Sequence, residues 1–206
     1  MTTDRRNHWE RVYGEKPPNE VSWYQSDPTL SLALIDAASV APDDPIIDVG
    51  GGASLVVDRL LERGFRDLTV LDVADTALAL VRSRLGAVFE RIEFIRADVT
   101  QFAPSRRYAL WHDRAVFHFL TEPDDRLAYV AALRAALRPR AHVIIATFAL
   151  DGPSRCSGLD VARYDADGLA SQLGSGFALC RVELEQHITP ARRMQHFQYC
   201  LFRTAA

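Results

Sequence analysis

Residues 46–54 read Ile-Ile-Asp-Val-Gly-Gly-Gly-Ala-Ser, a short apolar run that ends in an acid and is followed by three consecutive glycines. Glycine has no Cβ, so this loop can turn sharply and lie close to a ligand. The next segment, from Leu55 to Arg63, has helical spacing and stops before Gly64. The free N–H groups of a first helical turn would face the same loop. The stretch predicts a strand, a nucleotide-binding loop and a helix, and the alternative is a tight structural turn.

Two further strand-like segments each carry an acid near their end. The run from Leu68 to Val73 carries Asp72, and the run from Ile92 to Val99 carries Asp98. Asp72 follows the glycines by about 20 residues, where a ribose-binding carboxylate is expected in a nucleotide-binding βαβ unit. One carboxylate can accept from both hydroxyls of a ribose. The alternative for Asp72 is a cap on a helix that begins near Ala74.

The spacing of the small residues separates two kinds of cofactor site. A dinucleotide site needs G-x-G-x-x-G/A, and here the third position falls on Leu55, which is too large. The pattern acid-x-Gly-x-Gly-x-small is met by Asp48, Gly50, Gly52 and Ser54. This pattern resembles motif I of the class I S-adenosylmethionine-dependent methyltransferases. A nucleotide-dependent oxidoreductase is the weaker alternative.

The order of elements agrees with that resemblance. Strand-like and helix-like segments alternate, and two final strands follow without a good helix between them. We expect an α/β fold: a doubly wound, mostly parallel seven-stranded sheet with helices on both faces and a C-terminal antiparallel hairpin. With 206 residues and 48% hydrophobic residues, one domain and one core are expected. Its parts would be an N-terminal lid and helix (1–43), a cofactor-binding core (44–150), and a substrate loop with the terminal hairpin (151–206).

The resemblance implies S-adenosylmethionine as cofactor and S-adenosylhomocysteine as product. It places the ribose at Asp72 and the adenine amine at Asp98, with the apolar Val99 against the ring. The cofactor-binding residues that it implies are Asp48, Gly50, Gly51, Gly52, Ser54, Asp72, Val73, Asp98, Val99, Asp113 and Tyr24.

A cluster of ionisable residues ends the segment from Tyr108 to Phe119, which corresponds to motif IV of that family. His118, Asp113 and His112 are the catalytic candidates, because such side chains can orient a substrate or accept a proton. Methyl transfer is an in-line displacement, so alignment and desolvation matter most. The alternative is an ion network from Asp113 to Arg114 with a packed histidine. The segment lacks the Asn/Asp-Pro-Pro-Tyr signature of amino-base methylation.

Two other segments compete for contact with the substrate. The aromatic N-terminal segment carries Trp23 and Tyr24, whose rings suit a lid over a sulfonium, or a staple to the sheet edge. The loop from Asp151 to Leu159 carries Arg155 and Cys156, and the alternative there is a surface loop with an inert thiol. The substrate candidates are Trp23, Arg114, Arg155 and Cys156.

Composition excludes several classes of function. The net charge of −3 supplies no basic field for nucleic acid. Three cysteines without C-x-x-C spacing and without a histidine cluster predict no metal. No apolar run is long enough for a signal peptide or a membrane span, so we expect a cytoplasmic protein without a membrane partner. The expected activity is methyl transfer to S, N or O of a small molecule. The alternatives are a protein-lysine N-methyltransferase and a non-catalytic cofactor-binding protein.

Overall fold

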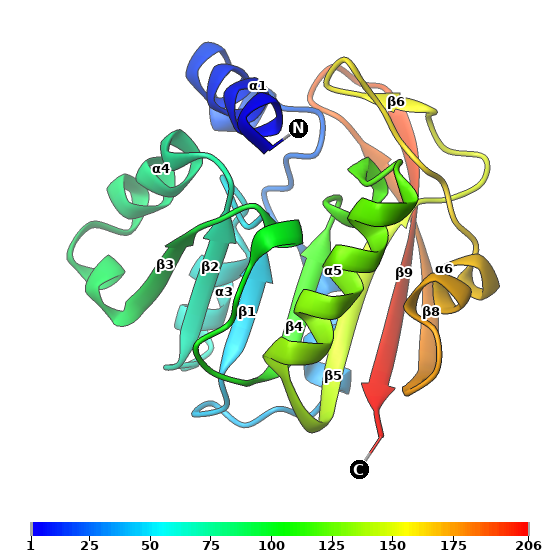
Figure 1. The fold of residues 1–206 in the computed structure, drawn as a ribbon. Coiled ribbons are helices and arrows are strands. Elements are labelled where there is room, and N and C mark those ends of the chain that lie inside the picture. Colours follow the sequence, from blue (N-terminus) through cyan, green and yellow to red (C-terminus); the bar gives the residue numbers. More distant parts are fainter. Residues whose placement is uncertain (1, 206) are drawn as a thin grey trace.

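The computed structural model describes residues 2–205 and contains a seven-stranded sheet with the order β3-β2-β1-β4-β5-β9-β8. Strands β1 to β5 pair in parallel, whereas β9 runs antiparallel to both β5 and β8. The predicted sheet and its terminal hairpin are therefore confirmed (Figure 1). The strands are β1 (Ile46–Val49), β2 (Leu68–Asp72), β3 (Ile92–Arg96), β4 (Tyr108–Arg114), β5 (Leu137–Phe148), β8 (Phe177–Ile188) and β9 (Met194–Thr204).

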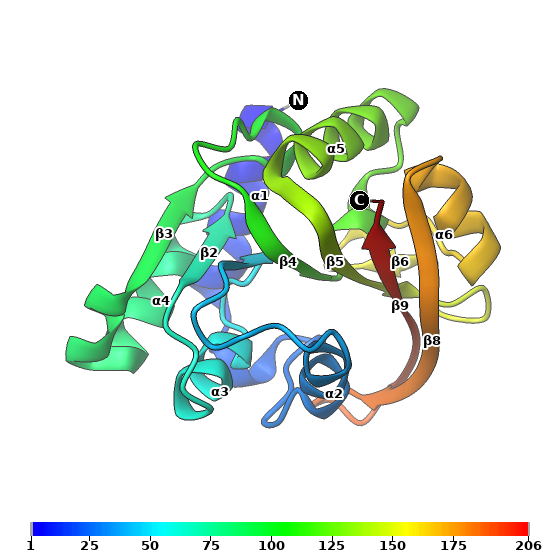
Figure 2. The same cartoon turned by 90° about the horizontal axis from the view of Figure 1, so that it is seen from below.

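Helices cover both faces of this sheet. Figure 2 shows α5 and α6 on one face and α2 and α3 on the other. Adjacent residues of a strand point to opposite faces. Ile46 accordingly packs with Leu34 and Leu60, whereas Ile47 packs in the cluster that holds Leu133. The helices of the chain are α1 (Thr2–Glu15), α2 (Thr29–Ala37), α3 (Val56–Glu62), α4 (Asp75–Leu85), α5 (Pro123–Ala136) and α6 (Ala166–Leu173), with short 3₁₀ turns η1 (Pro18–Glu20), η2 (Gly86–Arg91), η3 (Val99–Gln101) and η4 (Phe117–Phe119).

The ends of α5 differ from the pattern in the sequence. The run Thr121-Glu122-Pro123-Asp124 predicts a capping box, but Glu122 is the N-cap residue and makes no side-chain cap bond. Pro123 occupies the first turn instead, where its fixed φ suits a helix start. The sequence also predicts that Pro139 ends the helix, which in fact ends at Ala136. Pro139 lies in β5, beside an irregularity in the pairing with β4 where a missing N–H is tolerated.

Helix α1 occupies a segment for which the sequence predicts a lid but no helix. It lies next to α4, above the ends of β1 and β2 (Figure 1). The carboxylate of Glu10 accepts hydrogen bonds from the backbone N–H groups of Asp75 and Thr76 at 2.8 and 3.0 Å, and from the Thr76 hydroxyl at 2.6 Å. These groups form the first turn of α4, whose dipole favours a negative charge. The helix is thus held by tertiary contacts that its sequence pattern does not reveal.

The Glu10→Ala variant is expected to unfold at a lower temperature than the parent, because the N-terminus of α4 loses its cap. Such caps contribute about 0.5–2 kcal/mol, which for a chain of this size is a fall in Tm of about 1–8 °C. Thermal unfolding followed by circular dichroism measures it. Glu15→Ala, an exposed acid of the same helix, is the matched control. Equal melting temperatures for the two variants would contradict the role of Glu10.

No helix within residues 2–205 is long and apolar enough to cross a membrane. The same residues include no group of three or more His, Cys, Asp or Glu side chains arranged to hold a metal ion.

Candidate cofactor and acceptor site

The glycine loop turns from β1 toward α3 at the carboxyl edge of the sheet. Gly50 has φ +64°, and a Cβ there would lie 2.0 Å from Cγ2 of Val116. Gly52 has φ +35°, and a Cβ there would lie 2.5 Å from the Tyr13 hydroxyl and 2.9 Å from the Asp72 carboxylate. Both positions therefore require glycine for their backbone conformation and for space. The predicted loop of small residues is confirmed as a structural feature.

Asp72 lies buried at the end of β2 and lines the main cavity. Its Oδ1 accepts the N–H of Ala74 at 2.9 Å, so the carboxylate does cap the start of the helical segment. Burial raises the pKa of Asp72 to about 7, against the opposing effect of hydrogen bonds from the backbone N–H groups of Ala74, Val73 and Gly52. One side chain thus combines the predicted cavity position with the capping role given as its alternative.

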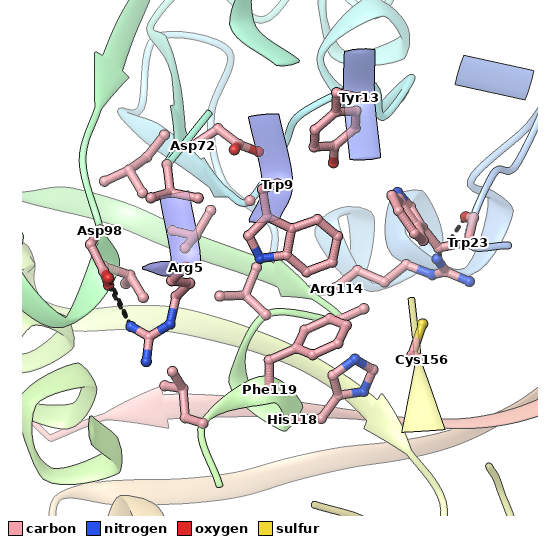
Figure 3. Close-up of a pocket in the computed structure, with 18 of the residues that line it drawn as sticks. Arg5, Trp9, Tyr13, Trp23, Asp72, Asp98, Arg114, His118, Phe119 and Cys156 are labelled. Atoms are coloured by element: carbon pink, nitrogen blue, oxygen red, sulfur yellow. Dashed lines mark hydrogen bonds and ion pairs between the residues drawn. The ribbon is translucent and has the colours of Figure 1, made fainter. Parts of the chain in front are cut away.

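Asp98 ends the segment after β3 and is engaged by helix α1. Its two oxygens accept from Nη1 of Arg5 at 3.0 and 2.7 Å, and Oδ1 also accepts from the Thr100 hydroxyl at 2.8 Å. Nη2 of Arg5 reaches Asp125 at 2.7 Å. Figure 3 shows the Arg5–Asp98 pair at one end of the cavity. Nothing in the polar N-terminal sequence indicated that Arg5 would bridge β3 and α5.

Beneath the glycine loop, three side chains form a buried hydrogen-bonded chain. Nδ1 of His112 lies 2.7 Å from Oδ1 of Asp48, and Nε2 of His112 lies 2.9 Å from Oγ of Ser31. The order Ser, His, Asp matches a nucleophile triad in type, but Ser31 is fully buried and cannot meet a substrate. Oδ2 of Asp48 has no partner within residues 2–205 and lies 2.7 Å from where a Cβ on Gly51 would be. The chain ties α2 to β1 and β4.

Asp113 is also buried, on the face of β4 that packs against α5. Oδ1 accepts the N–H of Val116 at 2.8 Å, and Oδ2 accepts the N–H of Phe117 at 3.1 Å and the Tyr129 hydroxyl at 2.7 Å. Nε1 of Trp111 donates to the same hydroxyl at 2.9 Å. Burial raises the pKa of Asp113 to about 6, although these hydrogen bonds favour the carboxylate. The network fixes the turn that follows β4.

The Tyr129→Phe variant is expected to lose stability, because both the Asp113 carboxylate and the Trp111 N–H lose a buried partner. Leaving such a group unsatisfied costs about 1–3 kcal/mol, a fall in Tm of about 2–12 °C. Thermal unfolding measures the change. Tyr164→Phe is the control, since Tyr164 is also buried in the same cluster but its hydroxyl makes no hydrogen bond to residues 2–205. If the Tyr129→Phe and Tyr164→Phe variants have the same Tm, the stabilising role of this hydrogen-bond network is contradicted.

The main cavity lies at the carboxyl edge of the sheet, under α1, and encloses about 790 Å³ of atom-free space that is partly open to solvent. One end is formed by the strand ends of β1, β2 and β3, and the other by His118 of η4 and the aromatic side chains of β5 and β9. Figure 3 shows Trp9 and Phe119 between these two ends. The predicted site residues that line this cavity are Gly50, Asp72, Val73, Asp98, Val99, Trp23, Arg114, His118 and Cys156.

A second, smaller cavity adjoins the glycine loop. Gly50, Trp23 and Arg114 line both cavities, so the two meet at these residues. The predicted site residues found in the smaller cavity are Asp48, Gly50, Gly51, Ser54, Tyr24, Trp23, His112 and Arg114.

Three predicted site residues line neither of these cavities: Gly52, Asp113 and Arg155. Arg155 lies on a short hairpin of β6 (Arg155–Cys156) and β7 (Leu159–Asp160), exposed and paired with Asp160 at 3.0 Å. Its side chain also donates to the Gly158 carbonyl at 2.8 Å. Its placement favours a role in the hairpin turn and gives no support to recognition of a substrate anion.

Arg114 lies in the wall between the cavities and is held on several sides. Its guanidinium donates to the Tyr199 hydroxyl at 2.6 Å, the Trp23 carbonyl at 3.0 Å and the Glu185 carboxylate at 3.1 Å. It also stacks 4.3 Å from the centroid of the Phe197 ring. These contacts fasten the N-terminal segment to β8 and β9. The ion network between Asp113 and Arg114, given as the alternative for this segment, does not form among the described residues, because β4 directs the two side chains to different partners.

His118, in turn η4, is fully buried at the aromatic end of the main cavity. Its Nδ1 accepts the N–H of Phe148 at 3.3 Å, and its Nε2 has no partner within residues 2–205. Burial, with the nearby charge of Arg114, lowers the pKa of His118 to about 3. Sequence reasoning missed Gln195 and Phe197, which reach this end because β9 pairs with β5. Because both residues lie far from His118 along the chain, no local sequence pattern connects them to it.

Comparison with known proteins shows which proteins this chain is similar to. Residues 46–140 match the family described as "Methyltransferase domain". Over 95 residues the chain is 21% identical to the eEF1A lysine and N-terminal methyltransferase of Mus musculus, which is 46% of this chain and 13% of that protein. The chain therefore spans only a small part of this longer relative.

Solved structures share the fold along nearly the whole chain. One, described as the conversion of a disulfide bond into a thioacetal group during echinomycin biosynthesis, superposes with a TM-score of 0.79 at 19% identity, over 97% of this chain and 91% of that one. The 1,6-didemethyltoxoflavin-N1-methyltransferase of Burkholderia thailandensis superposes with a TM-score of 0.69 at 20% identity, over 99% and 85%. The chain thus shares the fold of solved S-adenosylmethionine-dependent methyltransferases, and its residues 46–140 are similar to a methyltransferase domain.

Proposed function

We propose that this protein transfers a methyl group from S-adenosylmethionine to a small-molecule acceptor and releases S-adenosylhomocysteine. The observation that carries the proposal is the row of acids Asp48, Asp72 and Asp98 at neighbouring strand ends around the three glycines. Ligands of doubly wound sheets bind at this edge. The match to the methyltransferase domain spans all three acids.

The residues of the cavity suit this cofactor. Asp72 has an oxygen that faces the cavity and would accept the ribose hydroxyls, while Asp98 and Val99 would hold the adenine. A Cβ at Gly52 would lie 2.9 Å from the Asp72 carboxylate, so glycine at this position leaves space beside that buried side chain. When bound, the cofactor supplies an electrophilic methyl group on a positively charged sulfur.

The chain's own side chains would exclude water from that group. Trp9 packs edge-on to Trp23 and Phe119, with ring centroids 5.7 and 5.0 Å apart. Aromatic faces attract a sulfonium and keep the site dry. Because Arg5 donates to both oxygens of Asp98, an adenine amine would compete with Arg5 for this carboxylate.

A small-molecule acceptor is favoured by the aromatic end of the cavity, where His118, Phe148 and Phe197 are buried. The toxoflavin-type relative was solved with 1,6-didemethyltoxoflavin and S-adenosylhomocysteine bound. The eEF1A-directed relative is named for lysine and N-terminal methylation, so a protein acceptor is the second candidate.

Thermal unfolding with S-adenosylmethionine, S-adenosylhomocysteine and NAD tests the proposal. A ligand at about 100 times its Kd adds about 2.7 kcal/mol to the stability, a rise in Tm of about 5–11 °C for a chain of this size. We expect this rise with the first two ligands and none with NAD. A rise with NAD alone would support an oxidoreductase, and no rise with S-adenosylmethionine would overturn the proposal.

The affinity for S-adenosylmethionine is expected to increase as the pH rises through 7. Asp72 has a pKa of about 7 in the unliganded protein, and its ionised form is the better acceptor for ribose hydroxyls. If only the ionised form binds, Kd at pH 6 is about ten times Kd at pH 8. Isothermal titration calorimetry at several pH values measures this dependence. A Kd that is constant from pH 6 to pH 8 would contradict the assignment of Asp72.

A further inference from the structure

The two ends of the main cavity differ in charge. Asp72 and Asp98 are its only carboxylates among the described lining residues, and both lie at the cofactor end. The other end, beyond β4, β5 and β9, is aromatic, and its polar side chains are His118, Cys156, Gln195 and Arg114. We call it the acceptor end. The described lining of this end has no carboxylate, and its guanidinium, that of Arg114, is paired with Glu185.

The tautomer of His118 follows from its hydrogen bond. Nδ1 accepts from the backbone N–H of Phe148, so in the neutral ring the proton is on Nε2. The low pKa that burial and Arg114 impose keeps the ring neutral at physiological pH. Nε2–H is therefore a hydrogen-bond donor, and it cannot take a proton from an acceptor molecule.

No other described side chain at the acceptor end is a base at neutral pH. Burial raises the pKa of the Cys156 thiol, which contacts the Ser22 hydroxyl at 3.7 Å. At the cofactor end, burial and the charge of Asp72 raise the pKa of the Tyr13 hydroxyl well above its usual value. Asp113 and His112 face away from this cavity toward α5 and α2. The acceptor must therefore bring a usable lone pair with it.

Two buried polar atoms at the acceptor end have no partner within residues 2–205: Nε2 of His118 and Oε1 of Gln195. Both residues are at least nine-tenths buried. An unsatisfied buried group is costly, so a ligand that offers a hydrogen-bond acceptor to His118 would bind favourably.

We propose that the methyl acceptor is an aromatic thiol that reacts as its thiolate. Its ring would lie against the aromatic side chains of the acceptor end, and the Nε2–H of His118 would donate a hydrogen bond to the thiolate. The inference rests on the proposed function and narrows it, because an alkylamine such as lysine is protonated in water and needs a base that this end does not supply. In the transfer, a lone pair of the thiolate forms the bond to the methyl carbon. The carbon–sulfur bond of the cofactor breaks with its electron pair left on sulfur, and no proton moves.

The first arm of the test compares acceptors after calorimetry has shown that S-adenosylmethionine binds. The probes are thiophenol, the size-matched cation benzylamine, and a lysine-containing peptide, with S-adenosylhomocysteine formation as readout. We expect thiophenol to be methylated with a kcat/KM at least about 100-fold above that of either amine. Comparable turnover of benzylamine or the peptide, or no turnover of thiophenol, would overturn the acceptor class while the proposed function stands. Failure to bind the cofactor would instead overturn the proposed function.

The second arm tests His118 with two variants of similar size. His118→Gln can keep a donor near the Nε2 position, whereas His118→Phe removes it. Removing a hydrogen bond to a charged group lowers kcat/KM by about 10- to 150-fold. We expect this loss for His118→Phe and only a small part of it for His118→Gln. The Kd for S-adenosylmethionine should be unchanged in both. Equal losses in the two variants would contradict the donor role.

A pH profile separates a thiolate acceptor from an enzymatic base. At saturating S-adenosylmethionine, kcat/KM is measured for thiophenol and for the more acidic 4-nitrothiophenol. We expect the midpoint of each profile to follow the ionisation of the thiol used. A midpoint that is the same for both thiols would show that a group of the protein takes the proton and would overturn the inference.

Discussion

Replacing Asp72 with Asn is expected to weaken S-adenosylmethionine binding by about 10- to 150-fold. The carboxylate at the end of β2 lines the main cavity, and it would accept from both ribose hydroxyls. An amide has one oxygen, and each hydrogen bond to a charged group contributes about 1.5–3 kcal/mol. Calorimetry of the parent and the variant measures the loss. Asp124→Asn, an exposed acid at the start of α5, is the control and should bind like the parent.

The same substitution should not destabilise the unliganded protein at pH 8. Burial raises the pKa of Asp72 to about 7, above the value of about 3.9 for an unfolded chain. Between these values the folded state binds more protons, so its stability falls as the pH rises. Asn removes that penalty, and we expect a Tm at pH 8 equal to or above that of the parent, with a smaller difference at pH 5. A lower Tm of the variant at pH 8 would mean that damaged folding explains the lost binding, and it would contradict the assignment of Asp72 as the ribose ligand.

Gly50→Ala is expected to be the most destabilising addition of a single methyl group in the loop. Its φ of +64° strains any residue with a Cβ, at about 1–2 kcal/mol. The new methyl would also lie 2.0 Å from Cγ2 of Val116, and overpacking of this kind costs about 1–3 kcal/mol. Together the two effects predict a fall in Tm of about 4–20 °C, measured by thermal unfolding.

Two variants separate strain from overlap. Gly64 has φ +87°, and a Cβ there would have no neighbouring atom within 4 Å among the described residues. Gly64→Ala therefore reports strain alone and should melt higher than Gly50→Ala. Adding Val116→Ala to Gly50→Ala should restore part of the lost Tm, because the overlapping methyl is gone. Failure of the double variant to recover any stability would contradict the close approach of Val116 to the glycine loop.

The framework of the site could be predicted from sequence because it is local. Each of Asp48, Asp72 and Asp98 lies at or just after the end of a short strand, and parallel pairing of neighbouring strands brings these ends to one edge of the sheet. The consecutive glycines indicate a backbone with positive φ, which Gly50 and Gly52 adopt. Loop, strand and helix signals of this kind depend on few residues that are close together along the chain.

The chemistry of β4 was harder to predict because side chains alternate along a strand. His112 points to α2 and bonds Ser31, whereas Asp113 points to the opposite face and bonds Tyr129. Neither enters the main cavity. His118 enters because the 3₁₀ turn after β4 carries it over the sheet edge. The ionisable residues of this segment are thus divided between the two faces of β4 and the turn η4 that follows it.

Long-range pairing supplied the rest of the site. Arg5 reaches Asp98 across 93 residues, and Gln195 reaches the acceptor end through the antiparallel pairing of β9. These positions carry no local motif, since an arginine in a polar helix and a glutamine in a strand are both ordinary. Only the assembled sheet and the docked α1 bring them to the cavity.

A crystal structure with S-adenosylhomocysteine is the most direct test of the central claim that this cavity is a methyltransferase cofactor site. We predict the ribose hydroxyls within hydrogen-bond distance of Asp72, the adenine amine at Asp98 against Val99, and Arg5 displaced from that carboxylate. S-adenosylhomocysteine bound elsewhere, or bound here with the Arg5–Asp98 pair intact and Asp72 without contact, would contradict the account.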